Sequence, residues 1–353
     1  MKVLGVEMSK SGSNYYRLEM PFQHLTQTTD VEYARCNTLN QFPIEVLSQF
    51  DYVVYSREIE HYNNVENIKL IAKQVHDAGC KLIVDIDDYW ELSTYHVLRT
   101  EYKIFKAAEK IKESIRVADI VTTTNELLAE KIRKINPNVY VLPNAIYPEI
   151  YPQFQPNYQY SDKYRIGYMA GVCHWEDVVL LQEGVKMLHA DKNLSGKYTI
   201  KLFGYNEQSP EYKRFEQVFT DRGNGKDYER VYATDVYNYS LGYNNLEAVV
   251  VPLNYNTFNS CKSELKMIEA GFMGKACIVS NVPPYTNIIK NGVNCIAIDR
   301  NRNHKEWYKA MRKLINEPDY GRFLADNLSR EMKENYHISK VNVERYKVLK
   351  SNL

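Results

Sequence analysis

The feature that most constrains this chain is a repeated alternation of short apolar runs with longer amphipathic stretches. In residues 2–142, the β-branched runs predict strands, and the segments between them carry apolar residues at helical spacing. Strands separated by helices form a parallel sheet. The same alternation restarts at residue 164 and continues to a last expected strand at 295–298. A chain of 353 residues is long enough for two such α/β domains, each with its own core.

Each half contains a regular series of expected elements. In the first half, strands are expected at residues 2–7, 51–56, 81–85, 119–124 and 139–142. Helices are expected there at 17–25, 64–78, 100–117 and 126–135. In the second half, the expected strands are 164–170, 198–203, a short strand near 231, 248–252, 276–280 and 295–298. The helices expected there are 176–190, 211–220, 236–243, 262–272, 304–315, 320–334 and 339–349.

A cluster of prolines separates the two halves. Four of the twelve prolines lie in one short stretch, at Pro143, Pro148, Pro152 and Pro156. Because proline lacks an amide donor and fixes φ, such a cluster interrupts helices and strand ladders alike. It predicts an interdomain linker that acts as a hinge. Two α/β domains joined in this way face each other with the loops at the carboxyl ends of their strands, and the cleft between them is the expected site.

Composition excludes several classes of protein. The 45 basic and 44 acidic side chains give a net charge of +1, which does not favour a dedicated nucleic-acid binder. No stretch approaches eighteen uncharged apolar residues, as a membrane span requires. The first residues, MKVLGVEMSKSGS, lack the apolar core of a signal peptide, and the six cysteines form no CxxC pair. We therefore expect a cytoplasmic protein with reduced thiols.

Five motifs occur along the chain in an order typical of one enzyme family. The strongest is the segment 259–280, NSCKSELKMIEAGFMGKACIVS, which contains the pattern KSxxKxxE. The others are VLPN at 141–144, IGYMAG at 166–171 followed by His174 and Asp177, NYYR at 14–17 and DIDD at 85–88. In this order they resemble the GT-B glycosyltransferases, especially the retaining family 4, in a variant branch of bacterial and phage enzymes.

The resemblance implies a fold and an activity. It implies two Rossmann-like, doubly wound domains that face each other across a cleft: an acceptor-side domain at 1–155 and a nucleotide-sugar donor domain at 156–338. The helix at 339–353 is then expected to pack back on the first domain. The implied activity moves a sugar from a nucleotide diphosphate sugar, such as a UDP or GDP sugar, to a hydroxyl of a carbohydrate or lipid-linked acceptor. The implied chemistry retains the anomeric configuration and needs neither metal nor cofactor.

The donor diphosphate requires positive charge, which helix N-termini and lysines supply. Lys262, expected in the first turn of a helix, and Lys266 are expected to stabilise the departing diphosphate. Glu269 matches the second glutamate of the family's pair, which contacts the ribose, whereas Cys261 stands where the first glutamate is usual. The remaining residues expected to bind the donor are Ser263, Gly171, His174, Arg17 and Asn14.

One departure from the family shifts the expected diphosphate site. The family's arginine and lysine after the first strand of the donor domain are missing, because His174 is the only candidate cation between Arg165 and Lys186. The phosphate-binding role is therefore expected to fall to Lys262, Lys266, His174 and Arg17.

Asp87 and Asp88 follow a predicted strand and are expected to act on the transferred sugar. Two other interpretations stay open: DxD also occurs as a Mn²⁺ or Mg²⁺ site in single-domain glycosyltransferases, and such aspartates often cap turns. Arg57 and His61, after the strand at 51–56, are candidates for the acceptor side.

Three alternatives concern function and partners. The missing glutamate and the missing basic pair are also compatible with an inactive nucleotide-binding homologue. A phage enzyme that glycosylates modified DNA bases is disfavoured by the neutral net charge. Residues 102–116 carry five basic side chains beside isoleucines, which would suit a weak peripheral contact with the inner face of a membrane. Three glutamates in or next to this stretch favour a solvated helix face instead.

Overall fold

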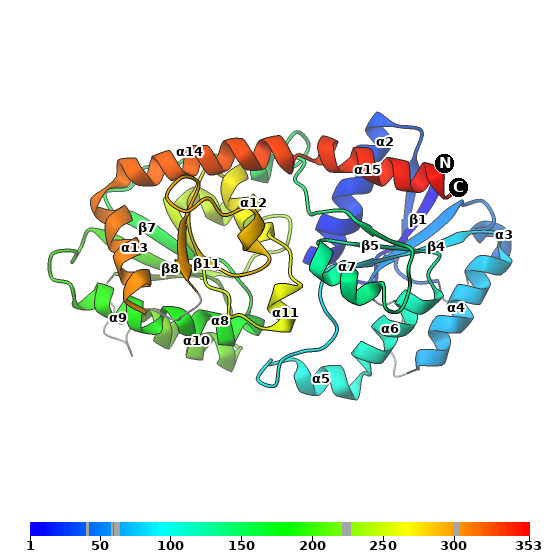
Figure 1. The fold of residues 1–353 in the computed structure, drawn as a ribbon, viewed down its shortest axis with the longest axis horizontal. Helices are drawn as coiled ribbons and strands as arrows, with labels where there is room; N and C mark the ends of the chain where they lie inside the picture. Colours follow the sequence, from blue (N-terminus) through cyan, green and yellow to red (C-terminus); the bar gives the residue numbers. More distant parts are fainter. Residues whose placement is uncertain (40–41, 58, 60–63, 221–226, 300–303) are drawn as a thin grey trace.

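Two six-stranded parallel sheets form the protein (Figure 1), which confirms the predicted pair of Rossmann-like α/β layers. The computed structural model describes all residues except 40–41, 58, 60–63, 221–226 and 300–303. The first sheet has the order β2-β1-β3-β4-β5-β6 and the second β12-β11-β10-β7-β8-β9. The strands of the first sheet are β1 (Lys2–Val6), β2 (Glu32–Cys36), β3 (Tyr52–Ser56), β4 (Lys81–Ile86), β5 (Ile120–Thr123) and β6 (Val139–Val141). Those of the second are β7 (Tyr164–Tyr168), β8 (Tyr198–Tyr205), β9 (Tyr228–Tyr232), β10 (Ala248–Val251), β11 (Ala276–Asn281) and β12 (Ile296–Asp299).

Helices cover the sheets as expected for doubly wound layers. In the first half they are α1 (Gly12–Asn14), α2 (Met20–Thr28), α3 (Ile44–Leu47), α4 (Val65–Asp77), α5 (Arg99–Ile104), α6 (Ala107–Val117) and α7 (Glu126–Ile132). A π-helical turn at Tyr15–Glu19 joins α1 to α2. In the second half they are α8 (Trp175–Val178), α9 (Gln182–Ala190), α10 (Pro210–Thr220), α11 (Thr257–Ser260), α12 (Leu265–Phe272), α13 (His304–Asn316), α14 (Pro318–Asn335) and α15 (Ile338–Ser351).

The strand order of each sheet determines where a ligand can bind. In the first sheet the chain runs from β1 outward to β2 and then returns to β3 on the other side of β1. In the second sheet it runs from β7 through β8 to β9 and returns to β10 beside β7. At such a reversal the loops after two neighbouring strands diverge and leave a crevice at the carboxyl ends. The two crevices face each other, and the candidate site lies between them.

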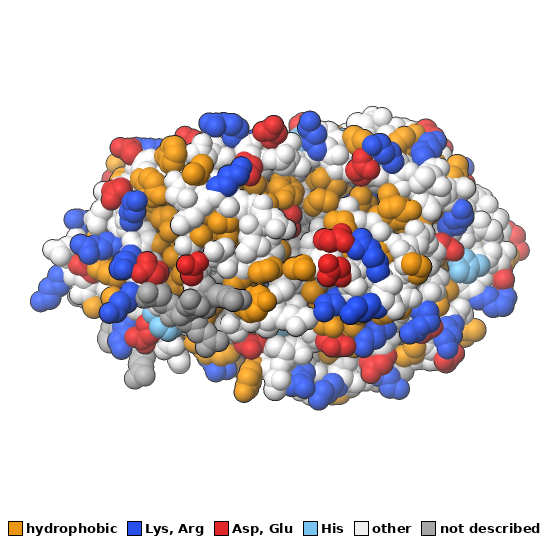
Figure 2. Space-filling model, viewed as in Figure 1, with side chains coloured by type: hydrophobic (Ala, Val, Ile, Leu, Met, Phe, Trp, Pro, Cys, Tyr) orange, Lys and Arg blue, Asp and Glu red, His pale blue; other side chains and the backbone are white. Residues whose placement is uncertain are grey.

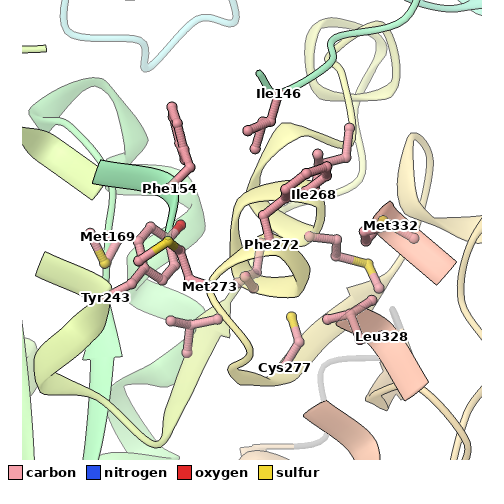
Figure 3. Packing of buried hydrophobic residues seen from close by; sticks show 14 of the residues in the cluster. Ile146, Phe154, Met169, Tyr243, Ile268, Phe272, Met273, Cys277, Leu328 and Met332 are labelled. Carbon is pink, nitrogen blue, oxygen red and sulfur yellow. The ribbon is translucent and has the colours of Figure 1, made fainter. Parts of the chain in front are cut away.

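An apolar cluster joins the two halves behind this site. In Figure 3, Ile146 of the linker lies beside Ile268 of α12, and Leu328 and Met332 of α14 surround Phe272 from the other side. Each of these side chains is almost fully buried. Burial of one such side chain stabilises the folded state by about 1.5–3 kcal/mol. The cluster therefore fixes the position of α12, which also carries residues that face the cleft.

The chain crosses between the halves twice, and the two crossing segments are hydrogen-bonded to each other. The Ile146 amide donates to the Tyr336 carbonyl at 3.0 Å, and the Ile338 amide donates to the Ile146 carbonyl at 2.9 Å. Beyond this point α15 lies on the first half, where the Tyr52 hydroxyl donates to the Leu349 carbonyl at 2.6 Å. Both termini therefore lie on the same half (Figure 1).

Several elements of the first half differ from the prediction, and the short helices α1 and α3 were not predicted. The helix expected at 100–117 is divided into α5 and α6, because Lys106 adopts the left-handed conformation with φ of 48°. Lys110 of α6 is buried, so the basic residues of this stretch do not share one solvent-facing surface. Strand β2 was not predicted, since its sequence EYARC forms a half-exposed sheet edge without an apolar run.

Three helices of the second half differ from the prediction. The helix expected at 176–190 is divided into α8 and α9 by a 3₁₀ turn at Val179–Leu181. The helix expected at 262–272 begins only at Leu265, and Lys262 lies in the turn between α11 and α12 rather than in a first helical turn. The Asn125 side-chain amide donates to the carbonyls of Cys261 and Lys262 at 2.9 and 2.8 Å, so the first half takes up the groups that a longer helix would use. The segment expected as a helix at 236–243 is a 3₁₀ helix at Tyr239–Asn245.

Charge is distributed evenly on the visible surface. On the face shown in Figure 2, Lys and Arg side chains are interspersed with Asp and Glu over both halves. Among the described residues, no helix has the length and apolar character needed to cross a membrane.

Candidate active site

A cavity of about 470 Å³ lies between the carboxyl ends of the two sheets. Its walls come from the loops after β1, β4, β7 and β10 and from the first turns of α12. The polar residues that line it include Ser13, Tyr16, Arg17, Asp87, Asp88, Asn144, His174, Tyr239, Tyr243, Lys262, Ser263, Lys266 and Glu269. The cavity therefore brings together most of the residues that the sequence singled out, from both halves of the chain.

On the first-half side, two carboxylates share one guanidinium. Arg57 Nε and Nη2 donate to the two oxygens of Asp87 at 2.5 and 2.9 Å, and Nη2 also donates to Asp88 at 2.8 Å. The Ser13 hydroxyl donates to Asp87 at 2.7 Å. Burial alone would raise the pKa of Asp87, but the Arg57 guanidinium outweighs it and holds the pKa at about 2. Asp87 is thus a carboxylate at neutral pH.

The Lys262 ammonium extends this cluster across the cleft. Its Nζ lies 3.5 Å from Asp88 Oδ1, and it also lies over the ring of Phe258, 4.4 Å from the centroid. The neighbouring Ser263 hydroxyl accepts a hydrogen bond from the Asn144 amide at 2.8 Å. Lys262 and Ser263 are therefore held in the cleft by contacts to the first half, although they belong to the second.

Within the described parts of the chain, no three His, Cys, Asp or Glu side chains gather as ligands for a metal ion. Asp87 and Asp88 instead have cationic partners in Arg57 and Lys262.

Arg17 lies on the wall of the cavity, but its donors are used within the protein. Its Nε and Nη2 each donate to one oxygen of Asp85 at 2.9 Å, and Nη1 donates to the Leu142 carbonyl at 2.7 Å and to Asn144 at 3.1 Å. Arg17 is 1% exposed. This geometry differs from the expectation that Arg17 binds phosphate, since a bidentate carboxylate neutralises it. We assign Arg17 to fixing β4 and the linker behind the site.

On the second-half side, Glu269 is enclosed by hydroxyls and an ammonium. The Tyr16 hydroxyl donates to Oε1 at 2.6 Å, and the Tyr243 hydroxyl and Lys266 Nζ donate to Oε2 at 2.8 and 3.0 Å. Lys266 also donates to the Tyr239 hydroxyl at 2.5 Å. Burial would lower the pKa of Lys266, but Glu269 outweighs it and raises the pKa above its ordinary value. Lys266 is therefore charged, although it lies in a partly enclosed site.

His174 closes the same side of the cavity. Its Nδ1 lies 2.8 Å from Asp177 Oδ2, and Asp177 is itself fixed by the Asn254 amide at 2.7 Å and the Asn259 side chain at 2.8 Å. Burial acts to lower the pKa of His174, but hydrogen bonds to Asp177 and Cys173 raise it to about 9. A protonated imidazole thus faces the cavity at neutral pH.

Three of the described residues expected at the site, Asn14, Arg57 and Gly171, do not line this cavity. Asn14 turns its side-chain amide back to the Ser9 carbonyl at 2.7 Å. Gly171 lines a neighbouring cavity of about 430 Å³. His61 lies outside the described residues.

Several residues of the site escaped the sequence analysis. Tyr16 and Tyr243, which hold Glu269, and Ser13, which holds Asp87, were not singled out. Tyr16 lies inside the motif NYYR, which was the one available signal. Tyrosines elsewhere in the chain carry no local pattern that distinguishes a site residue from a core residue.

No model of a known protein family matches this sequence, and no curated protein matches it. Solved structures do match the whole chain. HepE from Anabaena, solved in complex with UDP and glucose, is 14% identical over 99% of this chain and 100% of its own, with a TM-score of 0.68. Sucrose-phosphate synthase from Thermosynechococcus elongatus is 13% identical over 99% of this chain and 98% of its own, with a TM-score of 0.67. The lipopolysaccharide outer core galactosyltransferase WaaB is 12% identical over 100% of both chains, with a TM-score of 0.61. The chain therefore has the two-domain GT-B fold.

Proposed function

From a fold that it shares with solved glycosyltransferases, we propose that this protein is itself a glycosyltransferase. It transfers a sugar from a nucleoside diphosphate sugar to a hydroxyl of a carbohydrate or lipid-linked acceptor. The observation that carries the proposal is the cavity of about 470 Å³ between the two halves, into which three cations from the second half and a carboxylate pair from the first converge. HepE, which has the same fold, was solved with UDP and glucose.

The cations provide the charge that a departing diphosphate needs. Lys262, Lys266 and the protonated His174 all line the second-half side of the cavity. Preorganised charges of this kind stabilise developing negative charge without reorganising at the moment of reaction. In the proposed step the bond from the anomeric carbon to the phosphate oxygen breaks, and the acceptor oxygen bonds to the same face of that carbon. The acceptor proton goes to the phosphate oxygen that leaves.

The carboxylates fit the sugar side of the reaction. Asp87 is ionised at neutral pH, and Ser13 and Arg57 fix its orientation. A fixed carboxylate can accept hydrogen bonds from sugar hydroxyls and stabilise positive charge at the anomeric carbon. Asp87 and Asp88 already have Arg57 and Lys262 as counter-charges. This ion pairing favours a role in contacting the transferred sugar over a role in binding a metal ion.

A panel of nucleoside diphosphates and their sugars, screened by thermal shift in EDTA, tests the proposal. A ligand that binds only the folded state stabilises it and therefore raises Tm. At a hundredfold excess of ligand over Kd, the free energy of unfolding increases by about 2.7 kcal/mol. We expect one nucleotide to raise Tm in EDTA, and Lys262→Met to abolish most of the rise. Lys309→Met, on the exposed face of α13, is the matched control and should behave as the parent protein.

Three outcomes would contradict the proposal or part of it. If no nucleotide raises Tm, the protein is not a nucleotide-sugar transferase. If a nucleotide binds but its sugar is never released or transferred in the presence of acceptors, the chain is an inactive nucleotide-binding homologue. A rise in Tm that requires Mn²⁺ would overturn metal independence alone.

A further inference from the structure

A second hollow lies beside the proposed transfer site, between the loop 89–98 and the second half. It has a volume of about 600 Å³ and adjoins a further hollow of about 330 Å³. The two share Tyr95, Glu176 and Asn254 as walls, so they form one continuous groove. We call it the aromatic groove and define it by Tyr89, Glu91, Tyr95, Trp175, Glu176 and Asn254. In Figure 1 its loop runs from β4 to α5 and extends towards α8 and α11 of the other half.

Aromatic rings and carboxylates both line this groove. Tyr95 is 77% exposed, and Trp175 carries the Arg214 guanidinium over its ring at 3.7 Å from the centroid. The carboxylates of Glu91 and Glu176 also line the groove. Exposed rings offer flat apolar faces, whereas carboxylates accept hydrogen bonds from hydroxyls. A chain of sugar rings presents both complements, namely apolar C–H faces and a rim of hydroxyl donors.

The groove begins where the proposed transfer takes place. Phe258, which lines the groove, contacts Lys262, which lines the transfer cavity, with 4.4 Å between Nζ and the ring centroid. Trp175 of the groove follows His174 of the cavity directly in the sequence. An acceptor hydroxyl in the cavity can therefore belong to a molecule that continues into the groove.

Both halves of the chain build the groove together. The Ser93 hydroxyl of the loop 89–98 donates to the Glu176 carboxylate of α8. The His96 ring of the same loop packs edge-on against Phe258 at 5.3 Å between centroids. The loop is thus held against the second half at two points, and the aromatic walls are in place before an acceptor arrives.

The charges of the groove argue against a polyanionic occupant. Glu91 and Glu176 line it together with the cations Lys131 and Arg214. Arg214 stacks on Trp175, and Lys112 beside the groove pairs with Glu91 at 3.0 Å. The two carboxylates offset the two lining cations, so the groove has no excess of positive charge to attract a phosphate backbone. Resting on the function proposed above, we propose that the aromatic groove binds the sugar chain of an oligosaccharide acceptor.

Trp175 supplies a direct readout of this binding. The other two tryptophans, Trp90 and Trp307, are 4% and 3% exposed, whereas Trp175 is partly exposed in the groove. The probes are a printed glycan array and, in solution, those glycans that the array retains, titrated against Trp175 emission without nucleotide. We expect glycans of three or more sugars to bind and to change the emission, and monosaccharides to do neither.

A variant with a matched control shows whether the groove is the binding site. Tyr95→Ala should weaken glycan binding about five- to tenfold, because it removes one exposed stacking face. Tyr160→Ala removes a similarly exposed tyrosine, 83% exposed, from the segment that precedes β7 and should leave glycan affinity unchanged. Nucleotide binding by thermal shift is measured on each variant in parallel.

Three results would overturn the inference while leaving the proposed function intact, provided that a nucleotide still raises Tm. They are an array on which no glycan binds, equal glycan affinity in Tyr95→Ala and the parent protein, and a Trp175 response to duplex DNA or anionic vesicles but not to glycans. Loss of the nucleotide response itself would instead contradict the proposed function.

Discussion

Arg57 is the residue whose backbone departs furthest from ordinary geometry at the site. Its φ is 61°, a left-handed conformation that costs a residue with a side chain on the order of 1 kcal/mol or more. The conformation is held by the Arg57 amide, which donates to the Asp85 carbonyl at 2.8 Å, and by the side-chain bonds to Asp87 and Asp88. Strain that the surroundings enforce in this way is typical of residues that position others at a site.

The ion pair of Arg57 and Asp87 predicts an acid-sensitive part of the stability. The pKa of Asp87 falls from its ordinary value of 3.8 to about 2, so its stabilisation is present above pH 3.8 and is lost as pH falls towards 2. This difference corresponds to about 2 kcal/mol. Asp87→Asn should therefore be less stable than the parent protein by about that amount at pH 6, with the gap shrinking below pH 4. Denaturant unfolding at several pH values measures it.

Arg57→Gln is the matching variant for this prediction. It keeps the Asp87 carboxylate but removes the cation, so it should also flatten the acid dependence. A gap between Asp87→Asn and the parent protein that stays constant from pH 6 to pH 3 would contradict the assignment.

At this scale the sequence predicted residue types better than partners. Asp87, Lys262 and Glu269 were singled out from their places after predicted strands and in the motif KSxxKxxE, and all three line the cavity. Arg17 was expected to face phosphate, yet it pairs with Asp85. That pairing depends on how closely α1 and the π-helical turn approach β4, which the local pattern of either segment does not contain.

Among the elements, α7 is linked to the second half through its N-cap residue, Asn125. The Asn125 side-chain oxygen caps α7 by accepting from the Leu128 amide at 3.0 Å, while its amide donates to the carbonyls before α12. One side chain thus begins a helix in the first half and shapes the turn that carries Lys262 in the second.

These two tasks can be separated by substitution. Asn125→Asp keeps the cap of α7, because aspartate is as favourable as asparagine at an N-cap position. It also places a carboxylate against the carbonyl oxygens of Cys261 and Lys262, which it repels. We expect unfolding free energy within about 1 kcal/mol of the parent protein and a loss of nucleotide binding by at least tenfold. Asn64→Asp, at the corresponding cap of α4, is the control and should alter neither. Unimpaired nucleotide binding by Asn125→Asp would show that the turn before α12 does not depend on the hydrogen bonds from Asn125.

The elements that the sequence missed share a physical cause. Strand β2 and the late start of the helix expected at 262–272 are both decided by neighbours distant in sequence: β1 for the strand, and Asn125 for the helix. Buried strands such as β4 and β10 were found because burial on both faces leaves a continuous apolar run. The break between α5 and α6 at Lys106 could not be predicted, because no glycine or proline marks it in the sequence.

At the scale of the whole molecule, the two halves are joined at three levels. The crossing segments pair at Ile146, the apolar cluster of Figure 3 packs behind the cleft, and side chains bond across it. We propose that the cleft opens about the paired segments, since these segments are the continuous backbone connections between the halves. A substrate that enters the cleft must then replace the side-chain hydrogen bonds that cross it or bind to the same groups.

Tyr16 is the clearest of these bonds across the cleft, and it predicts a trade between stability and affinity. Its hydroxyl occupies one oxygen of Glu269, the residue whose proposed partner is the ribose of the donor. Tyr16→Phe leaves a buried carboxylate with one partner fewer, which costs about 1–3 kcal/mol in the free protein. A ribose hydroxyl can supply the missing bond. We therefore expect a lower Tm without ligand and a larger rise in Tm with the nucleotide found in the EDTA panel.

Tyr243→Phe separates this effect from a general weakening of the site. Tyr243 donates to the other oxygen of Glu269 from within the same half, so its loss disturbs the carboxylate without removing a bond between the halves. Hydrogen exchange of the free proteins should accordingly quicken in the segment 143–156 for Tyr16→Phe but not for Tyr243→Phe. If Tyr16→Phe binds nucleotide more weakly than the parent protein, the hydroxyl is part of the donor site rather than a competitor for it, and Glu269 is presented to the ribose only when the halves are together.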